Sequence, residues 1–313
     1  MENLTTSQYA PVVLFVYARP DHAEKTLNAL AGNDLARDSD LIIFCDGPKK
    51  ESAVEKNKQV IELITKEQSL GRFRSVTLNI SEKNKGLAKS IITGVSEVMS
   101  KYGRCIVIED DVVTNPYFLT YMNDCLDTFE KDKTIFSIAG FTYPLKALKN
   151  YPHDIYLSYR SCSQAWGCWI DRWETIDWEV KDFDKLKKSF KKRKQFNRGG
   201  NDLYRMLRHQ MSGERDSWAI RFCYAQSKQN MYAIYPKETL TLNIGEDGSG
   251  THCQDTGKKV DYSRLDGKRH VTLEEVPLNK KVLREFKNQY RITFPEAVDW
   301  LLRKIFKKKS KKK

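Results

Sequence analysis

The sequence lacks an apolar run long enough to cross a membrane as a helix. Its only apolar run near the N-terminus, Val12–Ala18, is far shorter than the roughly 20 residues that a membrane-spanning helix needs. No basic region precedes this run, so the first residues do not resemble a secretory leader. We therefore expect a cytoplasmic protein without a transmembrane helix.

The sequence also lacks the cysteine patterns of metal sites and disulfide frameworks. It holds seven cysteines, an odd number, with no pair at CxxC spacing and no histidine–cysteine spacing that suits zinc. Cys162 and Cys168 are close in sequence, yet nothing else indicates an oxidising compartment. We expect buried, reduced thiols.

Acidic residues are scarce relative to basic ones, and the excess of basic residues is concentrated in two segments. The net charge is +13, from 54 lysines and arginines against 41 aspartates and glutamates. Residues 181–198 hold nine basic and two acidic residues, residues 303–313 hold eight basic and none acidic, and the rest of the chain is close to neutral. Charge alone would suit a nucleic-acid-binding protein. No recognised nucleic-acid module is present, so we expect no nucleic-acid partner.

The first half of the chain alternates short β-rich runs with helical patterns. The expected strands are Val12–Ala18, Leu41–Cys45, Ser75–Ile80 and Cys105–Ile108, with helices over 21–31, 51–67, 87–99 and from about residue 116. This alternation predicts an α/β fold with a Rossmann-like, mostly parallel sheet flanked by helices.

The second half is less regular. Strands are expected at 135–139, 155–159, 232–235 and 239–242, and helix over 206–226 with a break at Ser212–Gly213. The basic stretch 181–198 reads as helical, and a glycine-rich loop occupies 245–250. No internal repeat or long linker divides the chain.

Polar residues follow each of the four early strands. They are Arg19, Asp46, the Asn84-Lys85-Gly86 turn and the triplet Glu109-Asp110-Asp111. Ligands of parallel α/β sheets bind outside the carboxyl ends of the strands, so these groups should converge on one edge. Three successive carboxylates repel one another unless a cation or protonation relieves them, and oxygen ligands suit Mg²⁺ or Mn²⁺. The alternative is that one acid caps the next helix while the others are solvated.

Six segments in order resemble motifs of GT-A fold glycosyltransferases. They are LIIFCDG (41–47), NKGLAKSIITGV (84–95), CIVIEDDVVTNPYFLTYM (105–122), AWGCWIDRWE (165–174), DSWAIRFCYA (216–225) and NIGEDGSGTHC (243–253). The similarity covers roughly residues 10–255. It is nearest to bacterial family-two enzymes of surface-polysaccharide synthesis, with distant similarity to animal N-acetylglucosaminyltransferase I. It implies one domain over 1–285, with a nucleotide-sugar-binding half (1–130) and an acceptor-binding half (131–285).

The resemblance implies roles for the residues at the sheet edge. Asp46 would accept a hydrogen bond from the uracil of a UDP-sugar donor, and Arg19 would lie near the base or diphosphate. The nucleoside pocket would be lined by Asn84, Gly86 and Lys89. The alternatives are that Asp46 only forms a turn before Gly47 and that Arg19 is a surface residue.

The resemblance also implies metal ligands. Asp111 would bind Mn²⁺ or Mg²⁺, Asp110 would contact the ribose or the metal, and Glu109 completes the acidic group. His252, after the glycine-rich loop, is a candidate ligand of the metal or diphosphate, although a lone histidine is more often structural.

A general base and a sugar-stacking residue are expected in the second half. An inverting transferase needs a carboxylate near the acceptor hydroxyl, and the resemblance places it at Asp216, with Glu214 as the competing candidate. Helix capping is the alternative for either residue. Trp166 is a candidate to stack on a sugar, and packing in the core is its alternative.

The C-terminal extension, residues 286–313, predicts a membrane contact. Val298, Leu301, Leu302, Ile305 and Phe306 form one apolar helical face before a lysine-rich tail. Such a helix suits peripheral binding to the inner face of the plasma membrane, where an undecaprenyl-diphosphate-linked oligosaccharide or another glycan would be the acceptor. The alternative is a docked terminal helix with a solvated tail.

Two other activities compete with metal-dependent hexosyl or N-acetylhexosaminyl transfer. A sugar nucleotidyltransferase could also use an α/β sheet with acidic residues, but the phosphate-gripping loop expected near its first strand is missing. A catalytically silent, basic membrane- or nucleic-acid-binding protein would leave the acidic triplet unexplained.

Overall fold

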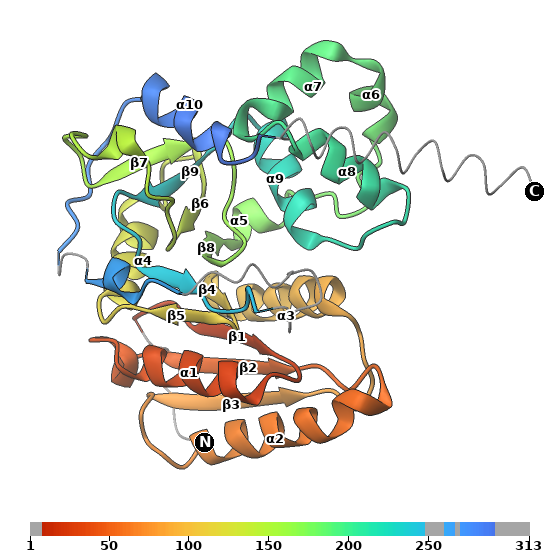
Figure 1. Cartoon of the computed structure of the whole chain (residues 1–313), viewed down its shortest axis with the longest axis vertical. Coiled ribbons are helices and arrows are strands. Elements are labelled where there is room, and N and C mark those ends of the chain that lie inside the picture. The colour runs from red at the N-terminus through yellow and green to blue at the C-terminus, as the bar shows by residue number, and fades with distance from the viewer. Residues whose placement is uncertain (1–7, 248–259, 267–269, 292–313) are drawn as a thin grey trace, which may run out of the picture.

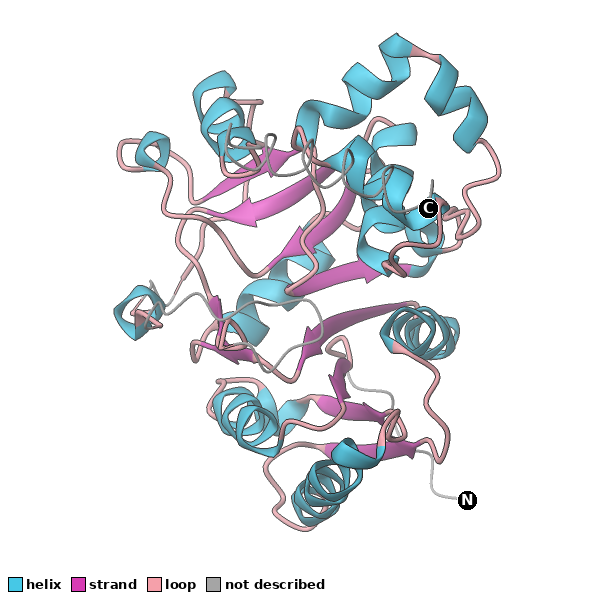
Figure 2. Cartoon of the chain, turned by 45° about the vertical axis from the view of Figure 1, so that its right-hand side comes forward, coloured by secondary structure: helices cyan, strands magenta, loops and turns pink. Residues whose placement is uncertain are grey.

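The fold is built on one eight-stranded sheet. The computed structural model describes residues 8–247, 260–266 and 270–291. Within them the strand order is β3-β2-β1-β4-β8-β6-β9-β7 (Figures 1 and 2). The strands are β1 (Val12–Val16), β2 (Asp40–Cys45), β3 (Ser75–Ile80), β4 (Arg104–Glu109), β6 (Ile135–Ala139), β7 (Ile155–Ser158), β8 (Ala165–Trp169) and β9 (Tyr232–Pro236). A separate two-stranded sheet joins β5 (Val112–Thr114) to β10 (Thr241–Asn243).

Four neighbouring strands of the large sheet run parallel. β1 lies between β2 and β4, with Val13 level with Ile42 and Val107, and β3 pairs with β2. Beyond β4 the sheet changes direction because β8 is antiparallel to both β4 and β6, while β6 and β9 are parallel. The carboxyl ends of β1 to β4 therefore meet at a single edge.

Helices cover both faces of the sheet (Figure 2). On one face α1, α2 and α4 bury Leu27, Ile64 and Leu119 in one apolar core. On the other, α3 and α9 bury Ile91 and Phe222 in a second core. The helices are α1 (Pro20–Ala31), α2 (Glu51–Glu67), α3 (Leu87–Tyr102), α4 (Phe118–Thr128), α5 (Ile170–Trp173), α6 (Phe183–Lys188), α7 (Phe190–Phe196), α8 (Leu203–Met211), α9 (Trp218–Lys228) and α10 (Lys280–Asn288).

The predicted α/β fold with a mostly parallel sheet flanked by helices is confirmed. The ranges predicted for α2, β3 and β6 match the observed ones, and the helix predicted over 206–226 is broken into α8 and α9. The basic stretch forms the two short helices α6 and α7. The strands β5 and β8 were not predicted, because β5 is very short and β8 lies in a tryptophan-rich segment that alternation does not mark as a strand.

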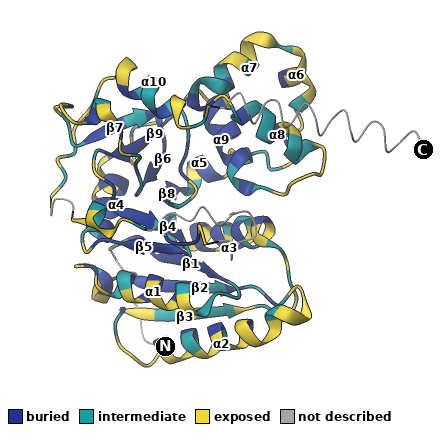
Figure 3. Ribbon diagram, viewed as in Figure 1, coloured by how far each residue is buried: buried dark blue, intermediate teal, exposed yellow. Residues whose placement is uncertain are grey.

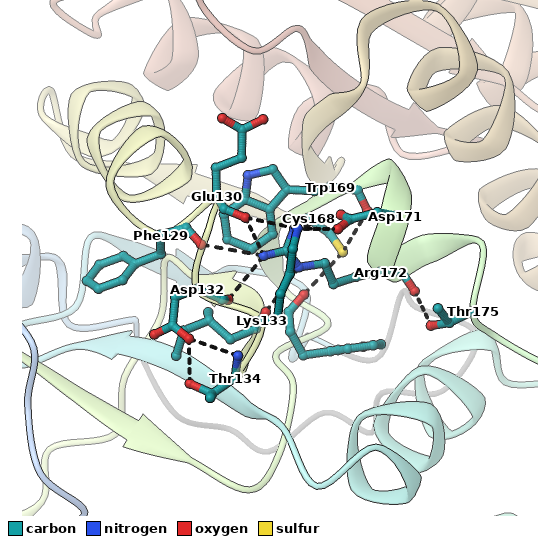
Figure 4. A network of polar contacts seen from close by, with 12 residues as sticks. Phe129, Glu130, Asp132, Lys133, Thr134, Cys168, Trp169, Asp171, Arg172 and Thr175 are labelled. Carbon is teal, nitrogen blue, oxygen red and sulfur yellow. Dashed lines mark hydrogen bonds and ion pairs between the residues drawn. The ribbon is translucent and has the colours of Figure 1, made fainter.

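A buried arginine holds the end of β8 against the turn before β6 (Figure 4). The guanidinium of Arg172 donates to the backbone carbonyls of Glu130 at 2.6 Å and Asp132 at 3.1 Å, and it pairs with the Asp171 carboxylate at 2.7 Å. The same group lies 4.3 Å from the ring centre of Trp169. One motif of the glycosyltransferase resemblance, residues 165–174, thus contains a structural clamp.

The remaining sequence expectations concern thiols, the membrane and the domain end. The six described cysteines are buried and free, as predicted. No helix in the described ranges has the length and hydropathy needed to cross a bilayer. The predicted boundary at 285/286 falls inside α10, whose Phe286 is buried against Tyr143, Tyr156 and Tyr235. The folded unit therefore continues to at least α10.

Candidate active site

The polar residues at the strand ends come together as expected. Arg19 lies between β1 and α1, Asp46 directly follows β2, the Asn84–Gly86 turn leads from β3 into α3, and Glu109 ends β4. Since these strands are adjacent and parallel, the residues share the carboxyl edge of the sheet. Two groups of contacts form there, one around Arg19 and one around Asp46.

Arg19 joins the two aspartates of the acidic triplet. Its Nη1 lies 3.0 Å from Oδ2 of Asp111, and its Nη2 forms an ion pair with Oδ1 of Asp110. The side chains are only 17%, 5% and 9% exposed for Arg19, Asp110 and Asp111, so water screens these pairs weakly. The guanidinium of Arg19 therefore supplies the first positive charge that offsets the packed carboxylates.

The cluster keeps an excess of negative charge. Burial raises the pKa of Asp110, and the paired Arg19 partly reverses that rise. Burial, with Asp111 and Asp110 nearby, raises the pKa of Glu109 to about 8. Burial works against charging Arg19, but its aspartate partners raise the pKa of Arg19 above its ordinary value. Three carboxyl groups, of which Glu109 has a raised pKa, thus lie near a single guanidinium, which leaves the site attractive to a further cation.

Asp46 organises the turn between β3 and α3. Its Oδ1 accepts the backbone N–H of Lys85 at 2.8 Å, and its Oδ2 accepts the N–H of Gly86 at 2.9 Å. Asn84 donates its side-chain amide to the carbonyl of Gly47 at 2.7 Å. Gly86 has φ of +80°, a conformation that side chains other than glycine rarely adopt, and it precedes the first turn of α3. The predicted pocket residues Asp46, Asn84 and Gly86 therefore form one connected loop pair.

The segment after β10 begins the glycine-rich motif 243–253 and covers the acidic triplet, a contact that the motif alone did not predict. The N–H of Ile244 donates to the carbonyl of Asp111 at 2.8 Å. A Cβ at Gly245 would lie 2.8 Å from Nη1 of Arg19 and would collide with the Asp111 carboxylate. His22 on α1 lies 3.2 Å from the carbonyl of Ile244 and 3.2 Å from Oδ2 of Asp247. The available signal was Gly245, the first residue of the glycine-rich loop.

The acidic cluster offers donors that suit a hard divalent cation, although the described residues form no complete cage. Among the described residues, no group of three or more histidine, cysteine, aspartate or glutamate side chains is arranged to hold a metal. Oδ2 of Asp110 is buried and accepts no hydrogen bond from the described part of the chain. Mg²⁺ and similar ions in nucleotide sites are commonly held by one or two carboxylates plus substrate phosphates. Asp110 and Asp111 fit that pattern.

The predicted general bases have partners of their own. Asp216 is 68% exposed and pairs with Arg221 at 2.9 Å, just before α9. Glu214 lies 2.7 Å from Nδ1 of His209 and is 64% exposed. Lys89 is exposed in the first turn of α3. His252 lies outside the described residues.

Trp166 lies in the core, which corrects its predicted place beside a sugar. It is 1% exposed, stacks on Trp173 and lies tilted against Trp218, with ring centres 5.7 and 5.2 Å away. Its register position opposite Val107 of β4 directs it into the second apolar core. Packing was the alternative for this residue, and it holds because β8 is a buried strand, which the sequence pattern did not mark.

Comparisons with known proteins give structural likeness only. No family model and no curated protein matches the sequence. Among solved structures, GalNAc-T7 with UDP, GalNAc and Mn²⁺ is similar with a TM-score of 0.43 and 11% identity, over 74% of this chain and 43% of that one. S. aureus TarS 1–349 is similar with a TM-score of 0.40 and 12% identity, over 72% of this chain and 60% of that one. The structure of S. aureus TarS is similar with a TM-score of 0.31 and 14% identity, over 42% of this chain and 21% of that one. This chain thus spans less than two thirds of the length of each of these three matched chains.

Proposed function

We propose that this chain is a glycosyltransferase that takes a sugar from a nucleotide-sugar, with a UDP-sugar as the favoured donor. The observation that carries the proposal is the ion-paired cluster of Arg19, Asp110 and Asp111 at the carboxyl edge of four parallel strands. A diphosphate needs positive charge, and a buried acidic cluster needs a cation. A nucleotide diphosphate arriving with a divalent cation meets both needs at once.

The base and ribose of the donor would bind beside the Asp46 loop. The Asp46 carboxylate already receives the N–H groups of three residues, Gly47, Lys85 and Gly86, which fixes its orientation. A carboxylate has about four acceptor sites, so it can also accept from the uracil imide. Asn84 and Lys89 flank the same turn and would line the pocket.

The metal, Mn²⁺ or Mg²⁺, would be held by Asp111 and Asp110. When bound, it would supply charge that stabilises the departing diphosphate. The chain's own contribution is orientation, because Arg19 and the N–H of Ile244 fix the side chain and the backbone of Asp111. Arg19 itself would meet a diphosphate oxygen. Glu109 would carry the proton that keeps the cluster from accumulating further negative charge.

The acceptor would be activated by a carboxylate from the α8–α9 segment, with Asp216 favoured over Glu214. Positioned proton removal contributes about 10²–10⁴-fold to a rate. In the resting arrangement Asp216 is tied to Arg221, so this pair would have to open for the acceptor hydroxyl to reach the carboxylate. Inversion at the anomeric carbon is the stereochemical outcome that goes with this base. The acceptor class we propose is a glycan or a lipid-linked oligosaccharide in surface-polysaccharide synthesis.

The decisive experiment is product analysis with UDP-sugars, Mn²⁺ and mixed glycan acceptors, with and without chelator. Metal-dependent release of UDP together with a glycosylated product supports the proposal. Release of UMP or sugar-1-phosphate would instead indicate nucleotidyl or phosphohydrolase chemistry. Asp111→Asn should abolish transfer, whereas Asp34→Asn, an exposed aspartate of the same chain, should leave it intact. Equal activity in both variants would refute the site assignment.

A further inference from the structure

The basic stretch 181–198 forms a helical hairpin of α6 and α7, here called the basic hairpin. It lies at the top of the molecule in Figure 1, at the opposite end from α2. Nine of its residues are basic and two are acidic. Figure 3 shows most of its outer side as exposed.

The apolar residues of the basic hairpin divide into two groups. Leu186 and Phe196 are buried against α8 and α9, and Phe183 packs on the same cluster. Phe190, at the junction of the two helices, is 73% exposed, the highest value among the exposed large hydrophobic side chains of the described residues. The hairpin therefore has its core, and Phe190 is left outside it.

The lysines around Phe190 are not neutralised. Lys181 pairs with Glu179 at 3.4 Å, and Asp182 pairs with Lys228 at 3.1 Å. Six further lysines of the hairpin are exposed and have no ion pair with any carboxylate in the described ranges: Lys185, Lys187, Lys188, Lys191, Lys192 and Lys194. The surface thus combines uncompensated positive charge with one projecting aromatic ring.

The hairpin is held firmly enough to present that ring. The hydroxyl of Ser189 accepts the N–H of Lys192 at 3.3 Å and caps α7. The guanidinium of Arg193 donates to the carbonyl of Lys187 and lies 5.6 Å from the ring centre of Tyr204 on α8. The link between the helices and the contact with α8 fix the position of residue 190.

We propose that the basic hairpin is a docking surface for an anionic lipid bilayer, with Phe190 entering the interface between headgroups and acyl chains. Lysines near an anionic surface each strengthen binding, and an apolar ring beside them adds burial in the interface. A single aromatic ring on a protruding hairpin suits a bilayer better than a nucleic acid, which proteins typically bind in a charged groove with several stacking rings. The basic hairpin shares no residue with the acidic cluster or with the extension 286–313.

The charge contribution is tested with vesicles and the full chain. Sedimentation with phosphatidylcholine vesicles should be weak, and admixture of phosphatidylglycerol should strengthen it. The triple variant Lys188→Gln, Lys191→Gln, Lys192→Gln should bind the anionic vesicles roughly a hundredfold more weakly, since each lysine contributes about fivefold. The matched control removes the same charge from α2, with Lys56→Gln, Lys58→Gln and Lys66→Gln, and should bind as the wild type.

Equal losses in the two triple variants would show a net-charge effect and overturn the proposal. Unchanged vesicle binding by the hairpin variant would also overturn it. Loss of affinity for duplex DNA or RNA in that variant, with vesicle binding intact, would assign the surface to nucleic acid instead.

The insertion of Phe190 is tested separately, independently of the C-terminal tail. A polarity-sensitive fluorophore on Phe190→Cys should shift to shorter wavelength with anionic vesicles, whereas the same label on Val54→Cys of α2 should not. The six described cysteines are buried, and labelling of the parent chain gives the background to subtract. No shift at position 190, or equal shifts at both positions, would refute insertion.

Discussion

Replacing Arg19 by methionine isolates the interaction on which the site depends. Methionine keeps an unbranched apolar side chain but removes the guanidinium that pairs with Asp110 and Asp111. The two carboxylates, 5% and 9% exposed, would then face each other and Glu109 without a partner. Removing one member of a buried ion pair costs about 3–5 kcal/mol, and we expect the lower part of that range because Arg19 retains some contact with water.

The measurement is the free energy of unfolding from urea titration at neutral pH with chelator present. Arg37→Met, an exposed arginine shortly after α1, is the control and should change stability by less than about 0.5 kcal/mol. Asp110→Asn added to Arg19→Met should recover part of the loss, because it removes one unpaired charge. A loss below about 1 kcal/mol for Arg19→Met, or no recovery in the double variant, would show that the guanidinium does not hold the cluster together.

Three further variants test the surroundings of the cluster. Asp46→Asn should lower the free energy of unfolding by about 1–3 kcal/mol, because the neutral amide holds the N–H groups of Lys85 and Gly86 less well. The same substitution should weaken UDP binding. Unchanged urea midpoints of unfolding would contradict this prediction. Gly245→Ala should reduce transfer at least about tenfold by displacing Asp111, while Gly32→Ala, where a Cβ has ordinary contacts at 3.5 Å, should not. Burial raises the pKa of Cys45 to about 12, and all six described cysteines are buried. In a Cys253→Ser chain no thiol should therefore react with Ellman's reagent at pH 8 until denaturant is added.

Much of the first half of the fold could be predicted because each element carries its own local signal. The range of α2 follows from one amphipathic pattern, and β3 ends where Ile80 gives way to polar turn residues. The convergence of Arg19 and the acidic triplet follows from topology, since adjacent parallel strands end at one edge.

The parts that escaped prediction depend on contacts far apart in sequence. Nothing local marks Ala165–Trp169 as the strand between β4 and β6, and that omission led to the misplacement of Trp166. The pairing of Arg19 with Asp110 could not be read from spacing, so a metal ion or protonation was expected to relieve the cluster, and the guanidinium was not foreseen. The cover formed by Ile244 and Gly245 depends on β10 pairing with β5, a contact across more than a hundred residues.

The central claim is that Asp111 and its neighbours bind a divalent cation together with a nucleotide diphosphate. Isothermal titration of UDP into the full chain, with Mn²⁺ and with chelator, tests it most directly. We predict that UDP binds only when Mn²⁺ is present, that Asp111→Asn abolishes this binding and that Asp34→Asn preserves it. Metal-independent UDP binding, or metal-dependent binding that survives Asp111→Asn, would contradict the account.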